Sequence, residues 1–399
     1  MNSKQIFSKK TIHDIDLQGK RVLLRVDWDI PWDNDGNITD DYRLAHSLPT
    51  ISYIMEHGAS IVIIAHRGRP KDHEPEMSLK HVAEQLGRRL NKTVQFVSDC
   101  VGREVVETAN QLKIGEVLVC ENLRFHPEEK ANDPDFARQL ATLGEVFVQN
   151  AFANTHRDHA SMTGVTKYLP SVAGLLIEQE ISAITHAVQD PQQPVVAITG
   201  GAKLETKLPL LEQFMKIANR IVIGGVMANT MLVAKGYQIG KSIYDEAELN
   251  VAKEMLNKAK ESNTELLLPL KDVAVGESVD VTNRRVVATD SVGENDLILD
   301  FGQKSIDSVI EAIKPAATII WNGPLGYFEN PLFAIGSNTL AKAIADSSAT
   351  SIVGGGDTAD VINSLGLVDK FTHVSTGGGA SLELMAGKYL PAVEALLDK

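Results

Sequence analysis

Cysteine is nearly absent from this chain of 399 residues, which contains only Cys100 and Cys120 and no CxxC pair. So few cysteines exclude a cysteine-rich metal site and fit a reducing compartment. The chain also lacks an HExxH motif, and its 11 histidines show no metal-ligand spacing. We therefore expect no zinc site built from these residues.

Long apolar runs and a surplus of positive charge are missing as well. No stretch of about 18 apolar residues occurs, and the first residues, MNSKQIFSKKTIHDID, contain no apolar core of signal-peptide length. The net charge of −13 argues against coating nucleic acid, because phosphate backbones select basic surfaces. We expect a cytoplasmic protein without membrane or nucleic-acid partners, and the length suggests two or three domains.

Short apolar, β-branched runs alternate with helical patterns along the whole chain. Runs typical of buried strands occupy residues 21–28, 60–67, 93–99, 116–125 and 145–152, and then 194–201, 219–225, 264–275, 317–324, 350–356 and 371–379. Repeated βα units predict parallel sheets with helices on both faces. The predicted fold class is α/β, with two doubly wound, Rossmann-like parallel-sheet domains joined by a long helix.

The joining helix is predicted over residues 174–190, a length of about 25 Å, and Pro191 and Pro194 mark its end. We predict an N-terminal domain over 1–173, a connecting helix and hinge over 174–194, a C-terminal domain over 195–386 and a tail over 387–399.

In open parallel sheets, ligands bind beyond the carboxyl ends of the strands, and the two halves differ there. The first half places basic residues after its strands: Arg43, His66, Arg67, Arg69, Arg124, His156 and Arg157. An exposed ion pair is the alternative for any single arginine, but the whole set favours an anion site. Arg21 and Arg25 lie before or inside a strand, and we interpret them as structural.

The second half has glycine-rich segments at the same points, in ITGGAKLETK, VIGGVMANT, IVGGGDTAD and HVSTGGGASLE. Glycines let main-chain N–H groups approach a phosphate at a helix N-terminus, and four such loops favour a polyphosphate ligand. No GxGxxG follows a strand, and AKGYQIGKS has Lys235 where a P-loop needs glycine. Two alternatives stay open at this point, a dehydrogenase on a doubly wound fold and a scaffold without catalysis.

Taken together, these segments make the chain resemble phosphoglycerate kinase nearly from end to end. The segments RVDWDIPWD, AHRGRPKD, ENLRFHPEE, AFANTHRDHAS, GGAKLETK, GGVMANT, TIIWNGPLGYFE, GGGDTA and HVSTGGGASLE occur in the family's order. The resemblance implies reversible phosphoryl transfer between 1,3-bisphosphoglycerate and ADP, giving 3-phosphoglycerate and ATP, with Mg²⁺. We also expect a monomer whose tail returns to the N-terminal domain.

The resemblance also assigns roles to individual residues. It implies that the phosphoglycerate is bound by Asp27, Asp29, Arg43, His66, Arg67, Gly68, Arg69, Arg124 and Arg157. It implies that the nucleotide is bound by Gly201, Ala202, Lys203, Lys207, Gly225, Asn322, Pro324, Glu329, Gly355, Gly356, Asp357 and Thr358, with Asp357 near the metal. The residues that would act on the transferring group are Arg43, Lys207, Gly378 and Gly379.

No general base is needed when the attacking group is a carboxylate, which fits the lack of a nucleophile–histidine pair. Arg43, Lys207 and Asp357 together argue against a scaffold. The chain departs from the family's usual residues at Asp29 (for Asn), Arg67 (for Leu), Asn150 (for Asp), Val226 (for Gly) and Gln303 (for Pro). For the first two, we predict that the negative and the positive charge offset each other.

Overall fold

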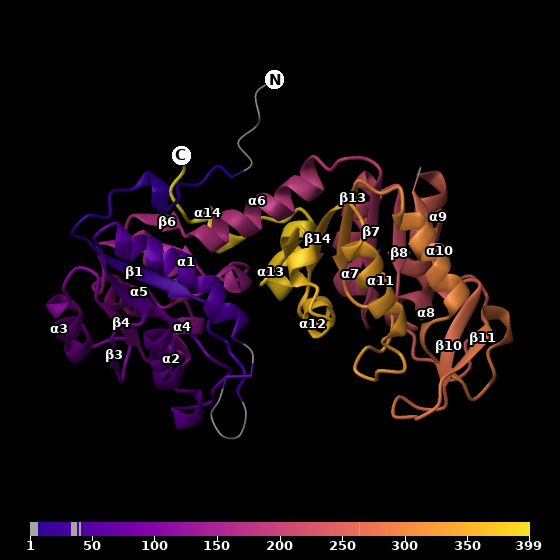
Figure 1. Cartoon of the computed structure of the whole chain (residues 1–399), viewed down its shortest axis with the longest axis horizontal. Coiled ribbons are helices and arrows are strands. Elements are labelled where there is room, and N and C mark those ends of the chain that lie inside the picture. The colour runs from indigo at the N-terminus through magenta and orange to yellow at the C-terminus, as the bar shows by residue number, and fades with distance from the viewer. Residues whose placement is uncertain (1–6, 33–37, 40, 263) are drawn as a thin grey trace. The chain divides into compact units, whose positions relative to one another are not determined.

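The computed structural model describes residues 7–32, 38, 39, 41–262 and 264–399, and the chain divides into two compact units. Unit 1 is Met1–Ser182 with Tyr389–Lys399, and unit 2 is Ala183–Lys388. Helix α6 (Leu175–Gln189) begins in unit 1 and ends in unit 2 (Figure 1). The last residues pair with the start of the chain, where the Lys10 N–H donates to the Leu397 carbonyl at 2.7 Å.

Unit 1 is built on a six-stranded parallel sheet in the order β3-β4-β2-β1-β5-β6. Its strands are β1 (Arg21–Val26), β2 (Ser60–Ile64), β3 (Val94–Val97), β4 (Val117–Cys120), β5 (Val146–Asn150) and β6 (Ser171–Ala173). Its helices are α1 (Tyr42–Glu56), α2 (Lys80–Leu90), α3 (Arg103–Gln111), α4 (Pro127–Lys130), α5 (Pro134–Ala141) and α14 (Pro391–Glu394).

Strand β1 shows why this sheet is covered on both faces. Val22 and Leu24 belong to one buried cluster, together with side chains of α1 and α2. Leu23, which points the other way, belongs to a second buried cluster with side chains of α3 and α5. Because alternate residues of a strand face opposite sides, a continuous apolar run needs a helical layer on each side.

Unit 2 repeats this plan with a six-stranded parallel sheet in the order β15-β14-β13-β7-β8-β9. Its strands are β7 (Val195–Thr199), β8 (Arg220–Ile223), β9 (Glu265–Leu267), β13 (Thr318–Asn322), β14 (Thr350–Gly354) and β15 (His373–Val374). Its helices are α7 (Leu204–Ile217), α8 (Gly225–Ala234), α9 (Leu249–Glu261), α10 (Gln303–Ile313), α11 (Ile335–Ala345), α12 (Gly356–Ser364) and α13 (Gly378–Met385). The prediction of two parallel-sheet α/β domains is confirmed.

Unit 2 also contains a three-stranded antiparallel sheet that the sequence patterns did not predict. It is formed by β10 (Asp272–Gly276), β11 (Arg285–Ala288) and β12 (Leu297–Phe301), in the order β11-β10-β12. The single strand predicted over 264–275 is wrong, because it is two strands in two sheets. Pro269 lies between β9 and β10, and proline cannot continue a hydrogen-bonded strand.

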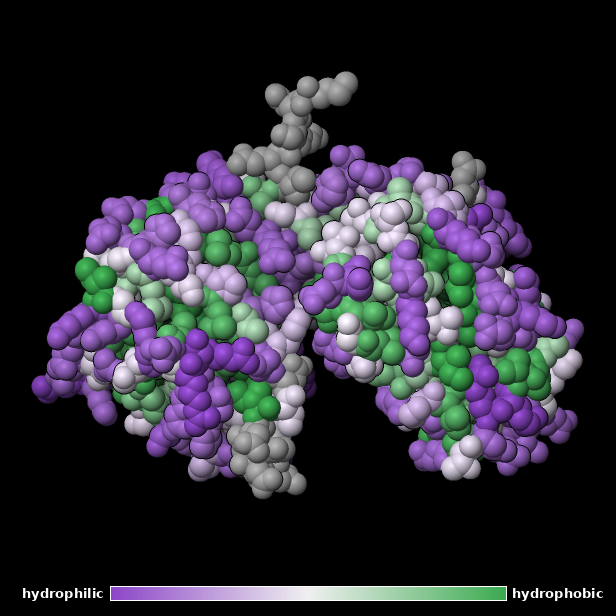
Figure 2. Space-filling model, in the orientation of Figure 1, coloured by the Kyte–Doolittle hydropathy of each residue, from purple (hydrophilic) through white to green (hydrophobic). Residues whose placement is uncertain are grey.

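Hydrophilic residues cover most of the face drawn in Figure 2, and hydrophobic residues form separate patches between them. The large hydrophobic residues that the described surface exposes include Ile114, Ile243, Leu270 and Tyr389. Among the described residues, no helix combines the length and the apolar character that crossing a membrane requires.

Candidate active site

The carboxyl ends of the strands in unit 1 gather the predicted basic residues at one edge of the sheet. Val26 lies beside Asn150, and Arg25 beside Ile64, so β1, β2 and β5 end at similar heights. Asp27, His66 and Arg157 follow these three strands, and Arg124 follows β4 in the short turn Leu123–Phe125. The topology of the sheet therefore brings these segments together.

Arg43 is the second residue of α1, and its Nη1 lies 2.7 Å from Oδ2 of Asp27. The Asp27 side chain is almost completely buried, whereas that of Arg43 stays 34% exposed. Asp27 can therefore hold Arg43 in place while the guanidinium still reaches solvent. The ion pair suits a residue that must present its charge to a ligand from a fixed position.

Arg69, Arg124 and Arg157 form no ion pair with any carboxylate that the structure describes. Arg124 is nearly buried, its Nη1 donates to the Gly68 carbonyl at 2.6 Å, and its Nε has no acceptor among the described residues. Burial lowers the pKa of Arg124 to about 10, with nearby Arg157 and Arg25 adding to the effect. Concentrated positive charge of this kind, without a directly paired carboxylate, favours an anionic ligand.

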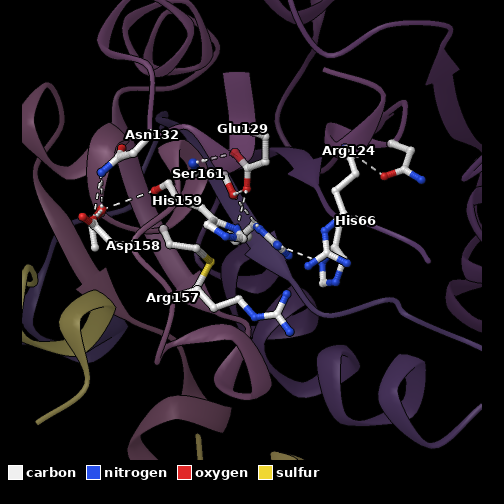
Figure 3. A network of polar contacts seen from close by, with 12 residues as sticks. His66, Arg124, Glu129, Asn132, Arg157, Asp158, His159 and Ser161 are labelled. Atoms are coloured by element: carbon white, nitrogen blue, oxygen red, sulfur yellow. Dashed lines mark hydrogen bonds and ion pairs between the residues drawn. The ribbon is translucent and has the colours of Figure 1, made fainter. Parts of the chain in front are cut away.

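His66 is held as a neutral side chain by the residues around it (Figure 3). Burial lowers its pKa well below the usual value, and the charges of Arg25, Arg124, Arg157 and Arg43 lower it further. Its Nδ1 lies 3.0 Å from Nη2 of Arg25. Because arginine can only donate, Nδ1 must accept, and the proton must sit on Nε2. His66 can thus donate a hydrogen bond from Nε2 to a ligand.

Arg25 has a larger part in this arrangement than its position inside a strand suggested. It is 1% exposed, and besides His66 it donates from Nε to the Ser161 Oγ at 3.0 Å. Ser161 in turn donates to buried Glu129 at 2.6 Å, and the Glu129 carboxylate also accepts the Ser161 N–H at 2.9 Å. The signal in the sequence was an arginine inside the otherwise apolar run of residues 22–26.

Glu129 supplies negative charge beside this cluster of arginines (Figure 3). Burial raises the pKa of Glu129, and Arg25 acts in the opposite direction. His159 lies 3.8 Å from the same carboxylate, and burial followed by the charges of Arg124, Arg157 and Arg25 lowers the pKa of His159 to about 4. Glu129 and Ser161 were not among the predicted site residues, because their role depends on contacts across the fold.

Arg67 and Asp29 occupy neighbouring loops, as predicted, but they use different partners. The Arg67 guanidinium lies 3.0 Å from the centre of the Trp32 ring and donates to the carbonyls of Ile30, at 3.3 Å, and Glu76. Asp29 accepts the N–H of Gly68 at 2.8 Å. Burial lowers the pKa of Arg67 to about 10, while the charge of Asp29 opposes this shift. The two charges interact, but both side chains are already bound to protein groups.

Among the described residues, one group of mixed metal-ligand types converges in the structure, although the sequence shows no such spacing. Asp99, Cys100 and His126 place ligand atoms within 4.8 Å of one another. The Asp99 carboxylate already accepts from the Cys100 N–H at 2.6 Å and from His126 Nε2 at 2.8 Å. These hydrogen bonds account for the convergence without an ion.

In unit 2 the glycine-rich segments also follow strands that end side by side. Asn322 of β13 pairs with Thr199 of β7 and with Gly354 of β14, while Val374 of β15 pairs with Val353. The helices α7, α8, α12 and α13 begin within a few residues of these strand ends. Their N-termini supply main-chain donors and positive potential at one edge of the sheet.

The glycines of these loops fall into two kinds. A β-carbon at Gly224 would lie 2.6 Å from the Cα of Leu325, and one at Gly200 would meet the Pro324 carbonyl. By contrast, a β-carbon at Gly356 or Gly378 would have no neighbour within 4 Å. The first kind lets two loops cross in contact, and only the second kind leaves main chain open to a ligand.

Lys207 and Asp357 are two of the four charged residues among the predicted nucleotide residues, beside Lys203 and Glu329. Lys207, in the first turn of α7, donates to Oδ1 of buried Asn322. Burial lowers the pKa of Lys207 to about 8, and the charge of Asp357 partly opposes the shift. Thr358 accepts the Gly323 N–H at 2.7 Å, which fixes the first turn of α12 and so places the exposed Asp357.

A largely apolar pocket in unit 2 brings several predicted residues together. The predicted nucleotide residues that line it are Gly201, Ala202, Gly225, Pro324, Glu329 and Asp357. Val226, where the family usually has glycine, also lines it. The remaining walls come mainly from β12 and from the loop that follows β13. An apolar cavity with a few polar groups at its rim suits a flat base that carries a charged chain.

Two other departures from the family's usual residues have local explanations. The Asn150 Oδ1 accepts from Thr50 at 2.9 Å and from the Leu176 N–H at 3.1 Å, so it ties β5 to the start of α6. Gln303 is the first residue of α10, and its amide donates to Asp307 at 2.9 Å. Proline is also favourable at the first position of a helix, so the exchange leaves the helix start intact.

Comparison with known proteins agrees with this architecture over almost the entire chain. The sequence model of the family described as phosphoglycerate kinase matches residues 12–388. The phosphoglycerate kinases of Dictyoglomus turgidum and Aquifex aeolicus are each 46% identical, over 98% of this chain and 100% and 99% of theirs. The structure of phosphoglycerate kinase from Coxiella burnetii superposes with a TM-score of 0.87 at 38% identity, covering 97% of this chain and 98% of that one. The chain belongs to the phosphoglycerate kinase family.

Proposed function

We propose that the chain binds its two substrates at the two sites described above, the phosphoglycerate in unit 1 and the nucleotide in unit 2. Its reaction is the reversible transfer of a phosphoryl group between 1,3-bisphosphoglycerate and ADP, which gives 3-phosphoglycerate and ATP in glycolysis. The observation that carries the assignment is that the two units offer different chemical groups to a ligand. Arginines without carboxylate partners gather in unit 1, and an apolar pocket beside Lys207 and open glycines lies in unit 2.

In unit 1, Arg69, Arg124 and Arg157 would bind the phosphate and carboxylate groups of 3-phosphoglycerate, and His66 would donate from Nε2. Arg43, held by Asp27, would stabilise the phosphoryl group as it transfers. Loose phosphoryl-transfer transition states carry charge on three equatorial oxygens, so fixed cations are the main catalytic requirement. The attacking carboxylate needs no base to deprotonate it.

In unit 2, the pocket would take the base, and Lys207 with the first turns of α12 and α13 would bind the phosphates. Gly378 has open space at its Cα and so would let the main chain approach the transferring group. Dehydrogenase or scaffold functions, the two alternatives left by the residue patterns, have no support from the family to which the chain belongs.

The reaction would use Mg²⁺ bound to the nucleotide, and Asp357 is a suitable residue to hold it. Mg²⁺ in such sites takes one or two carboxylates together with phosphate oxygens. Asp357 is exposed, lines the pocket and belongs to no cluster of protein ligands among the described residues, which fits this mode. When bound, the ion would neutralise phosphate charge. If Asp357→Asn left the Mg²⁺ dependence of turnover unchanged, Asp357 would only add a favourable negative charge in the first turn of α12.

We also propose that the protein acts as a monomer in the cytoplasm. Its two cysteines are free and buried, in keeping with a reducing compartment. Sedimentation at working concentrations should give one species with the mass of a single chain. A larger species would overturn the monomer.

A coupled assay tests the proposed function. Purified protein is mixed with ATP, Mg²⁺ and 3-phosphoglycerate, and 1,3-bisphosphoglycerate is detected through NADH consumed by an added dehydrogenase. We expect NADH oxidation that needs both substrates and falls sharply in Arg43→Ala. Oxidation that proceeds without 3-phosphoglycerate would contradict the proposal.

A further inference from the structure

Asp300, in strand β12, carries a buried carboxylate that the phosphoryl transfer does not use. The residue is 2% exposed, its Oδ2 accepts the Gly336 N–H at 2.7 Å, and its Oδ1 accepts the Phe301 N–H at 2.8 Å. Gly336 is the second residue of α11, where helix N–H groups have no partner within the helix. Asp300 therefore caps α11 from a neighbouring strand.

Capped in this way, α11 supports the loop that follows β13. Ser337, next to Gly336, accepts the Leu325 N–H at 2.9 Å. The same loop is attached to β12 itself, because the Tyr327 N–H donates to the Leu299 carbonyl at 2.7 Å. A β-carbon at Gly326 would lie 2.5 Å from the Asp300 Oδ1, so the loop rests directly on the carboxylate.

The loop in turn contacts the glycine-rich segment at the start of α8. The Leu325 carbonyl accepts the Gly225 N–H at 2.8 Å. The pocket is lined by Gly225, by the loop and by β12, including Asp300. A continuous set of hydrogen bonds thus runs from the buried carboxylate, through Ser337 and Leu325, to the pocket wall.

We propose that Asp300 is a positioning residue for nucleotide binding, which holds the wall of the pocket in place through α11 and the loop after β13. The proposal rests on the proposed function, in which this pocket takes the nucleotide. Asp300 would act through main-chain groups and would not touch the phosphates. Removing its charge should therefore weaken nucleotide binding and leave phosphoglycerate binding unchanged.

The cost of keeping an aspartate here supports a role beyond stability. Burial raises the pKa of Asp300 to about 7, despite two main-chain hydrogen bonds and the nearby charge of Arg284, which itself donates to the Phe301 carbonyl at 3.1 Å. The folded state thus binds the proton more tightly than the unfolded state, so this group makes folding weaker as pH rises from about 4 to about 7. A neutral residue would avoid that penalty.

Asp272 offers a matched control in the same antiparallel sheet. It is also buried, and its carboxylate caps α10 by accepting the N–H groups of Ser305, at 2.8 Å, and Lys304, at 3.1 Å. Asp272 does not line the pocket, and neither do the residues it caps. Asp272→Asn should therefore change stability without a selective effect on the nucleotide.

The test compares KM for ATP, KM for 3-phosphoglycerate, kcat and the melting temperature in the wild type, Asp300→Asn and Asp272→Asn. We expect KM for ATP to rise about tenfold in Asp300→Asn, the worth of one charge-assisted hydrogen bond, with KM for 3-phosphoglycerate unchanged. In Asp272→Asn, both KM values should stay at the wild-type level. Equal changes in both KM values of Asp300→Asn, or no change beyond its melting temperature, would overturn the proposal.

Ser337→Ala keeps the test decisive if Asp300→Asn does not fold, because it removes only the link between α11 and Leu325. The same selective rise in KM for ATP is expected, and an unchanged KM for ATP would refute the positioning role. A wild-type protein that turns over neither substrate would instead refute the proposed function, and the role of Asp300 with it.

Discussion

The sites in unit 1 and unit 2 are both suited to anions, but different chemical groups form them. Unit 1 uses side-chain cations, and it keeps Arg25 and Arg124 nearly buried with the buried carboxylates of Glu129 and Asp27 nearby. Unit 2 uses helix N-termini and open main chain, with the partly buried Lys207 as a cation. Fixed side-chain charge suits a small, highly charged acid, whereas main-chain donors suit a longer polyphosphate.

This difference predicts how each site responds to pH. Burial, together with the crowded cations of unit 1, lowers the pKa values of His66 and His159 and keeps both side chains neutral, so we expect acid to destabilise unit 1. In unit 2 the lowered pKa of Lys207 makes alkali the sensitive direction.

Arg43→Ala should give the largest loss, because it removes the unit 1 cation assigned to the transferring group. We expect kcat to fall by on the order of 10³ or more. Stopped-flow or coupled kinetics would measure it, with Arg43→Lys as the variant that retains the charge. If turnover stayed intact and only the affinity for 3-phosphoglycerate fell, Arg43 would be a binding residue like its neighbours.

Lys207→Ala should lower kcat by on the order of 10², as for the loss of one donor to developing charge. Lys216 is an exposed lysine of the same helix, so Lys216→Ala provides the control and should leave kcat unchanged. In the wild type, KM for ATP should also rise as the pH passes about 8, where the Lys207 ammonium loses its proton. Lys207→Arg, which keeps its charge, should abolish that rise. A rise that persists in Lys207→Arg would assign it to another group.

Acid should destabilise the fold through the neutral histidines of unit 1. Because the folded-state pKa of His159 lies near 4, the unfolded state binds more protons as pH falls below about 6.5. For each additional proton that the unfolded state binds, the free energy of unfolding falls by about 1.4 kcal/mol per unit decrease in pH. Urea unfolding at a series of pH values should show a shallower acid slope in His159→Asn, and an unchanged slope in the exposed His186→Asn control. Equal slopes in all three proteins would mean that His159 is charged in the folded state.

The smallest effect concerns Asp29 and Arg67, whose charges interact while each is bound elsewhere. A double-mutant cycle on 3-phosphoglycerate affinity, with Asp29→Asn and Arg67→Leu, should give a coupling of about 0.5–1 kcal/mol. Arg67→Leu should cost more in the wild-type background than beside Asp29→Asn. Additive effects would show that Trp32 and the carbonyl groups alone decide the position of Arg67.

The contrast between side-chain and main-chain sites also explains what the sequence could predict. The sequence pattern indicates which residues follow the strand ends, so it led to the prediction of Arg124 and the glycine-rich loops as site residues. The predicted bounds of α6 differ from the observed bounds by one residue at each end. The role of a residue inside a strand depends on which other elements pack against it, and the sequence pattern does not reveal those elements. Arg25 lies inside β1 and Asp300 inside β12, and only the packed structure shows that Arg25 holds a histidine and that Asp300 caps a helix.

The same limit applies to glycine. Gly224 and Gly378 look alike in sequence, since each follows a strand and precedes a helix. In the structure, the backbone of Leu325 packs against Gly224, whereas Gly378 is open. The antiparallel sheet escaped prediction for a related reason, because β11 has only four residues, is mostly exposed and contains an apolar run of just three residues.

Separate calorimetric titrations of 3-phosphoglycerate and ATP into Arg124→Ala and Lys207→Ala test the division of labour between the two sites most directly. We predict that Arg124→Ala loses affinity for 3-phosphoglycerate and keeps its affinity for ATP. Lys207→Ala should lose affinity for ATP and keep its affinity for 3-phosphoglycerate. If either variant weakened both ligands equally, or if the pattern were exchanged, the assignment of one substrate to each unit would be wrong.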